Sequence, residues 1–110
     1  MIHIGQYAPS FDHVTAYQKG HDGFRHVSLY DYAKQWVVLF FYPRDFTFIC
    51  PTEIQGLGQR ETEFTKLNAV VLAASTDSEW SHKAWFERDL ADVAYPILAD
   101  TNHSLAKAYD

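Results

Sequence analysis

The feature that most constrains the fold of this chain is an unbroken apolar segment, Trp36–Tyr42, which Pro43 ends. Its aromatic and β-branched residues favour an extended backbone, and its length is that of a strand. Because the apolar residues follow one another without alternating with polar ones, we expect a central strand covered on both faces. Such a strand needs neighbouring strands and layers of helix to bury it.

The residues before this strand predict a β-hairpin. Phe11–Tyr17 and Phe24–Leu29 have the composition of strands, and the turn between them, over 18–23, contains Gly20 and Gly23. Glycine adopts the positive φ angles that tight hairpin turns require.

The residues after it predict alternating helices and strands. In chain order, we expect a helix whose apolar positions run from Ile54 to Leu67, a buried strand over Ala69–Ser75, a helix over Glu79–Leu90 capped by Thr76–Ser78, a short strand over Tyr95–Ala99, and a helix over Ser104–Tyr109 capped by Asp100–Asn102. Pro96 requires the short strand to be an edge strand, or itself to stand at its beginning. Trp80 and Trp85 point in roughly one direction from their helix, and we expect both in the core.

The order of these elements, a hairpin followed by β-α-β-α-β-α, predicts an α/β fold with parallel strands joined by helices. The chain has 110 residues, which suits a single domain over 1–110. The sequence therefore predicts one layered α/β domain.

Composition excludes several functions. Asp and Glu outnumber Lys and Arg by 14 to 9, and the basic residues are scattered, so we expect no nucleic-acid partner. No apolar segment approaches the roughly 18 residues of a membrane span, and the first residues lack a secretion signal, so we expect a cytoplasmic protein without a membrane partner. The six histidines, at positions 3, 13, 21, 26, 82 and 103, lack metal-ligand spacing. We expect no metal and no cofactor, and His82 is the histidine that merits attention.

Cys50 is the only cysteine, and it lies between the apolar strand and the first long helix. Ligand sites of α/β sheets lie at the carboxyl ends of strands, and a helix start there favours a thiolate. Pro51 at the first helical position would make Cys50 the N-cap, whereas capping by Thr47 would make Cys50 the third residue of a turn. The alternative to a reactive thiol is a buried, inert one.

The neighbours of Cys50 provide further candidate site residues. Thr47 precedes Cys50 by three residues, so in a helical turn its hydroxyl lies on the same face as the sulfur. Pro43 would shield one side from water, and Arg44 is the one local cation, either near the thiol or as a solvated loop residue. Glu53 complements the positive helix start. This arrangement suits a thiolate that attacks a peroxide O–O bond.

The spacing Pro43-x-x-x-Thr47-x-x-Cys50, within Phe40–Ile54, resembles the active-site signature of the peroxiredoxins, especially the typical two-cysteine, alkyl hydroperoxide reductase type. The resemblance covers nearly the whole chain. Gly5–Phe11 resembles the amino-terminal motif of that family, Ser81–Trp85 its second helix and Tyr95–Asp100 the following strand. It implies a thioredoxin-like fold that is incomplete at its C-terminal end.

The resemblance also implies residue roles and partners. Cys50 would be oxidised by hydrogen peroxide or small organic hydroperoxides to a sulfenic acid, Thr47 would position the substrate and Pro43 would limit solvent access. Glu53 would join a polar network, and Trp85 would lie near the site. A thiol donor such as thioredoxin would supply reducing equivalents, and the protein would form a homodimer or a higher oligomer.

Two features of the family fall beyond residue 110 in this resemblance: a catalytic arginine and a resolving cysteine. Without them Arg44 or a partner subunit would have to act in place of the arginine, and an external thiol would have to reduce Cys50. The alternative functions are a catalytically incompetent interaction module and a redox sensor that forms mixed disulfides without turnover.

Overall fold

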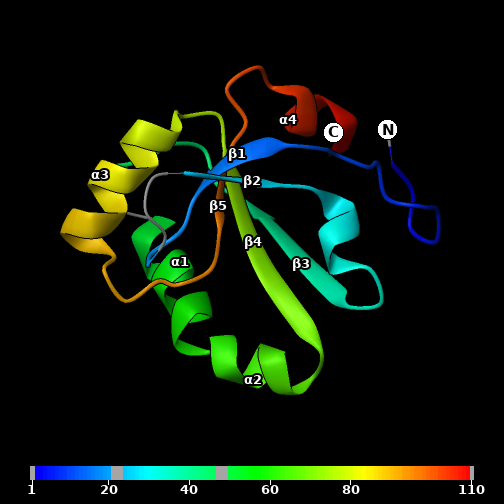
Figure 1. The fold of residues 1–110 in the computed structure, drawn as a ribbon, viewed down its shortest axis with the longest axis horizontal. Coiled ribbons are helices and arrows are strands. Elements are labelled where there is room, and N and C mark those ends of the chain that lie inside the picture. Colours follow the sequence, from blue (N-terminus) through cyan, green and yellow to red (C-terminus); the bar gives the residue numbers. More distant parts are fainter. Residues whose placement is uncertain (1, 21–23, 47–49, 110) are drawn as a thin grey trace.

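A computed structural model describes residues 2–20, 24–46 and 50–109, with only the backbone described at Cys50 and Pro51. Its five-stranded sheet has the order β2-β1-β5-β4-β3 (Figure 1). The strands are β1 (Val14–Tyr17), β2 (Arg25–Val27), β3 (Trp36–Phe41), β4 (Ala69–Ser75) and β5 (Ile97–Ala99). The α/β class is as predicted.

The pairing of the strands confirms both the hairpin and the parallel crossovers. β1 is antiparallel to β2 and to β5, while β3, β4 and β5 are parallel to one another. The hairpin strands are shorter than predicted, and its turn falls partly on residues outside the described ranges. A short 3-10 helix, η1 (Leu29–Tyr32), leads from β2 to β3. β5 lies inside the sheet, and Pro96 precedes it, in accordance with the second of the two places predicted for this proline.

The prediction that Trp36–Tyr42 forms a central, doubly covered strand is wrong. Among the described residues β3 pairs with β4 on one side only, and its side chains are half-buried in the middle and exposed at both ends. Continuous apolar sequence reports how much surface a strand has to bury but not its place in the sheet order, which depends on pairings between distant segments.

The helix predicted from Ile54 to Leu67 is divided in two. Helix α1 (Cys50–Gln59) and helix α2 (Glu61–Lys66) are separated at Arg60, whose φ of −102° and ψ of 8° depart from helical values. The apolar spacing continues across this break because both helices turn apolar residues towards the same core cluster. Side-chain spacing alone therefore does not reveal the break.

The other two helices begin where their caps predicted. Helix α3 (Glu79–Asp89) starts after Ser78, whose hydroxyl accepts a hydrogen bond from the Ser81 N–H at 3.1 Å. Helix α4 (Ser104–Tyr109) follows Asp100, whose carboxylate accepts hydrogen bonds from the N–H groups of Leu105 and Ala106. None of the described helices is long and apolar enough to cross a membrane.

The core has one cluster on each face of the sheet, and α1 and α3 lie together on one side in Figure 1 while α4 lies apart from them. Trp85 is buried in the first cluster, as predicted, with 1% of its surface exposed. Trp80 is 68% exposed and does not belong to the core, contrary to the prediction. Its ring instead meets Phe24 edge-on, at 4.8 Å between centroids.

Candidate active site

Cys50 stands at the start of helix α1, on the far side of a loop that follows the carboxyl end of β3. The backbone N–H groups of a first helical turn have no partner within the helix, and the helix dipole adds positive potential there. Thr47 lies outside the described residues, as does the segment that would decide between the two helix registers. The described backbone thus places the cysteine at a helix start at the carboxyl edge of the sheet.

The other candidate residues surround this loop at different depths. Pro43 and Arg44 are exposed just after β3, and Glu53 is exposed in the first turn of α1. Trp85 of α3 packs beneath the loop, with ring centroids 5.9 Å from Tyr42 and 6.0 Å from Phe46. Trp85 therefore belongs to the core and also supports the segment that leads to Cys50.

A buried polar cluster fixes the same loop. The Tyr42 hydroxyl donates to Asp45 Oδ1 at 2.7 Å, and His82 Nδ1 lies 2.8 Å from Asp45 Oδ2. On its other side, His82 Nε2 lies 3.0 Å from the carbonyl oxygen of Leu98, which can only accept, so Nε2 carries a hydrogen. The side chains of Asp45 and His82 are fully buried. This cluster ties the loop to α3 and to β5.

Electrostatics inside the cluster keep the phenol of Tyr42 protonated. Burial, with the neighbouring Asp45 carboxylate as the next cause, raises the pKa of Tyr42 well above its ordinary range. The hydroxyl therefore serves as a hydrogen-bond donor rather than as an acid. Every buried side-chain polar atom among the described residues has a hydrogen-bond partner.

Two further contacts hold the loop from outside. The Asp45 N–H donates to Asp77 Oδ2 at 2.6 Å. Phe46 has a φ of 61°, in the left-handed region that bulky side chains avoid. The Arg88 guanidinium lies 4.7 Å above the Phe46 ring centroid, and Trp85 contacts the same ring. Residues of α3 thus hold this unusual backbone in place.

Helix α1 has its own anchor. The buried hydroxyl of Tyr95 donates to the backbone carbonyl of Ile54 at 2.8 Å, and burial raises the pKa of this phenol. Glycine at position 58 allows the helix to approach this region closely, because a Cβ there would lie 3.2 Å from a methyl group of Val93. Helix α1, which begins at Cys50, is therefore anchored to the core.

Sequence reasoning missed most of this support. Tyr42, Asp45 and Asp77 were not among the predicted site residues, and His82 was singled out without a partner. One feature of the sequence could have indicated this cluster, because Asp45 and His82 are polar residues next to apolar segments. The two are 37 positions apart in the chain, so their spacing does not predict that they are in contact. Among the described residues no group of three His, Cys, Asp or Glu side chains could hold a metal ion.

The parallel β3–β4–β5 unit, the antiparallel β1 and the helices on both faces make a thioredoxin-like α/β fold with a cysteine at a helix start. The model of the AhpC/TSA family matches residues 4–110. The chain is 50% identical to peroxiredoxin prdx-2 of Caenorhabditis elegans over 96% of its own length, and 46% identical to bovine peroxiredoxin-2 over 97%. This chain belongs to the AhpC/TSA family.

Solved structures agree with this assignment. A reduced 2-Cys peroxiredoxin of Plasmodium vivax has a TM-score of 0.87 and 36% identity, and the match covers 96% of this chain and 68% of that one. The AhpC of Enterococcus faecalis has a TM-score of 0.84 and 38% identity, over 93% and 60%. The chain spans about half the length of the curated relatives it matches, 54% of the nematode protein and 55% of the bovine one.

Proposed function

We propose that this chain carries the peroxide-reducing site of a thiol-dependent peroxidase, with Cys50 as the reacting residue. The observation that supports this most is the place of Cys50, at the start of α1 on the carboxyl side of β3. A thiolate is the reactive form of cysteine, and unpaired N–H groups and the dipole at a helix start favour it. Membership of the AhpC/TSA family supports the same chemistry.

The proposed reaction has two steps. The Cys50 thiolate attacks the terminal oxygen of a hydroperoxide, the S–O bond forms as the O–O bond breaks, and the departing oxygen takes up a proton to leave as water or an alcohol. Cys50 is then a sulfenic acid. A donor thiol attacks its sulfur, water leaves, and a second thiol reduces the resulting disulfide.

The candidate residues take the following proposed roles. Thr47 binds the peroxide through its hydroxyl, and Pro43 excludes water from one side of the site. Glu53 and Arg44 belong to the polar surroundings of the site, and Trp85 supports the loop through its contact with Phe46. The donors that stabilise the departing oxygen are the Thr47 hydroxyl and the N–H of Cys50.

The partners follow from the chemistry. We propose hydrogen peroxide and small organic hydroperoxides as substrates, and thioredoxin or a related dithiol protein as the donor. A reducing compartment such as the cytoplasm keeps a lone thiol reduced. We also propose a homodimer or higher oligomer. Among the described residues β3 pairs with β4 alone, and an apolar strand edge without a second neighbour favours association.

The test uses the chain itself, since Cys50 is its one cysteine. The folded, reduced protein is mixed with micromolar hydrogen peroxide, and intact mass with a sulfenic-acid trap measures oxidation of the thiol. We expect trapped sulfenic acid in the wild type and none in Cys50→Ser. A wild type that stays fully reduced under these conditions would contradict the proposal.

The role of Thr47 is tested with a matched pair of variants. Thr47→Val removes the hydroxyl at the site, whereas Thr62→Val removes one from the exposed surface of α2. We expect the first to slow oxidation about tenfold or more, because a lost hydrogen bond to a charged group costs about 1.5–3 kcal/mol. The second should react as the wild type does, and equal rates in the two variants would remove Thr47 from the mechanism.

A further inference from the structure

Phe46 is the last described residue before Cys50 on the loop that leads from β3 to α1. Its φ of 61° lies in the left-handed region, where a bulky residue is strained unless its surroundings hold it. The preceding Asp45 is held by hydrogen bonds of its N–H and of its carboxylate. Phe46 is held through its ring, although 46% of its surface is exposed.

Two residues of α3 contact this ring. The Trp85 ring lies 6.0 Å from it, between centroids, and the Arg88 guanidinium carbon lies 4.7 Å from its centroid. Trp85 and Arg88 are three positions apart, so they are neighbours on one face of the helix. Trp85 is 1% exposed and belongs to the core, whereas the side chain of Arg88 is 64% exposed. Arg88 is therefore the member of this pair that can be replaced without disturbing the core.

The Arg88 guanidinium is itself oriented by a neighbour. Its Nε donates to Asp89 Oδ1 at 3.0 Å, and its Nη2 donates to Asp89 Oδ2 at 2.7 Å. A bidentate contact of this kind fixes the plane of a guanidinium. The positive charge is attracted to the π electrons of the Phe46 ring. Arg88 is thus held by two partners, the Asp89 carboxylate and the Phe46 ring.

The path of the chain after Phe46 determines where Cys50 lies. Cys50 follows four positions later, and its proposed reaction requires the sulfur, the attacked oxygen and the donors of the helix start to be aligned. A displacement of about 1 Å can slow an aligned reaction about a hundredfold. A contact that holds Phe46 in its strained conformation therefore affects the chemistry at Cys50.

We propose that Arg88 is a positioning residue for the reaction of Cys50 with peroxide, and this inference rests on the function proposed above. The guanidinium holds the Phe46 ring, and the ring holds the backbone of the loop. The loop in turn aligns the Cys50 sulfur with the peroxide. Arg88 itself does not touch the peroxide. Sequence spacing does not indicate this role, because Arg88 and Cys50 are far apart in the chain.

The test compares two reactions of the Cys50 thiol in the reduced protein. Oxidation by hydrogen peroxide depends on alignment, whereas alkylation by iodoacetamide requires only an accessible thiolate. A change in ionisation alters both rates alike, so the ratio of the two rate constants reports positioning. We expect Arg88→Met to lower this ratio about two- to fivefold, the factor by which a cation–π contact at an exposed site favours the held loop. Arg88→Lys keeps a cation at the ring and should retain most of the ratio.

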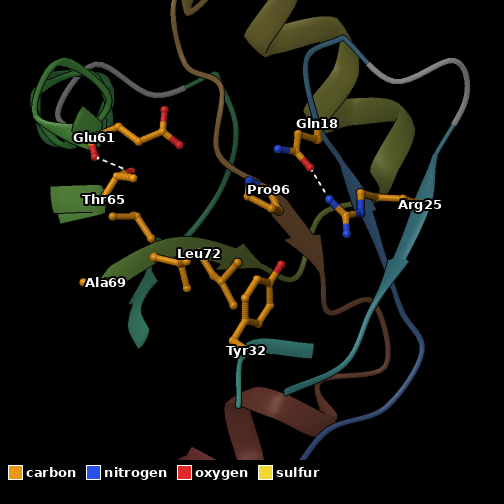
Figure 2. Close-up of a pocket in the computed structure, with 10 residues that line it drawn as sticks. Gln18, Arg25, Tyr32, Glu61, Thr65, Ala69, Leu72 and Pro96 are labelled. Carbon is orange, nitrogen blue, oxygen red and sulfur yellow. Dashed lines mark hydrogen bonds between the residues drawn. The ribbon is translucent and has the colours of Figure 1, made fainter. Parts of the chain in front are cut away.

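Two other arginines provide matched controls. Arg60→Met removes an exposed arginine that also pairs with a nearby carboxylate, that of Glu63, at the opposite end of α1 from Cys50. Arg25→Met removes a guanidinium that donates to Gln18 beside a cavity at the amino half of β4 (Figure 2). Both controls should keep the wild-type ratio. A fall in either control as large as that in Arg88→Met would overturn the proposal, because net charge would then explain it.

A double variant shows whether Arg88 acts through Phe46. Phe46→Leu removes the ring, so Arg88→Met should change the ratio no further in that background. If Arg88→Met lowers the ratio equally with and without the ring, the guanidinium acts on Cys50 by another route and the proposal is wrong. A wild type that peroxide does not oxidise would contradict the proposed function and this inference together. Oxidation of the wild type with an unchanged ratio in Arg88→Met would overturn this inference alone.

Discussion

The two ends of the sheet differ in how far their buried polar groups are hydrogen-bonded. At the carboxyl end, Tyr42, Asp45 and His82 are buried and hydrogen-bonded to one another, and His82 reaches the Leu98 carbonyl. At the amino end of β4, pairing with β5 begins only at Ala73, so among the described residues the buried peptide groups of Val71 have no strand partner on the β5 side.

The two ends differ in which groups form, or fail to form, their hydrogen bonds. The carboxyl end is completed by side chains, which form one network because each member needs the others. The amino end is left incomplete by one imino acid, Pro96, which cannot donate to the neighbouring strand. A complete network holds the loop before Cys50 in place, whereas the amino end of β4 has fewer hydrogen bonds between strands among the described residues.

The largest expected effect is the loss of one member of the network. His82→Leu leaves the buried Asp45 carboxylate without its histidine partner, and we expect the free energy of unfolding to fall by about 3–5 kcal/mol in denaturant titrations. The control His26→Leu, at an exposed histidine of β2, should change it by less than about 0.5 kcal/mol.

A double variant tests the network as a unit. Replacing both members of a buried pair by apolar residues removes the unpaired charge, so His82→Leu with Asp45→Leu should be more stable than His82→Leu alone. If the two substitutions destabilise additively, the side chains do not act as one network.

A smaller effect is expected where one hydrogen bond anchors α1. Tyr95→Phe removes the bond to the Ile54 carbonyl and should cost about 1 kcal/mol at pH 7. Burial raises the pKa of Tyr95 in the folded state, so the folded protein keeps this proton longer than the unfolded chain does. This contribution is complete below the unfolded pKa of about 10 and is lost as pH rises above it. Stability curves that stay a constant distance apart up to pH 11 would contradict this assignment.

The smallest effect on stability is expected at the incomplete end. Pro96→Ala allows a new hydrogen bond to Val71 but releases backbone freedom in the unfolded chain, and each effect amounts to about 0.5–1 kcal/mol. We therefore expect the unfolding free energy to change by less than about 0.5 kcal/mol, while hydrogen exchange at the backbone amide that this substitution introduces is slow. Rapid exchange of that amide would show that Val71 is not the acceptor.

Local chemistry made much of the fold predictable. Helix caps at Ser78 and Asp100, the extended backbone of β3 and β4, and the position of Pro96 depend on a few neighbouring residues. The structure has these local features as expected, although β3 does not have its predicted place in the sheet. Motif spacing also led to Cys50. The roles proposed for Thr47, Glu53 and Arg44 remain predictions.

The predictions that the structure contradicts were wrong for one physical reason. Whether β3 is central or at an edge, and whether Trp80 is buried, depends on which distant segments pack against them. The Asp45–His82 contact and the point at which β4 begins to pair with β5 likewise depend on residues far apart in the chain. Short-range propensity carries no information on such pairings.

The sequence by itself determined the alternation of strands and helices and the place of the cysteine at a helix start, because spacing, caps and prolines act locally. Only the tertiary structure decided the order of the strands, the burial of the Tyr42–Asp45–His82 cluster and the unpaired stretch of β4. Those features arise when the sheet assembles, since each buried polar group then finds its partner in another segment or finds none.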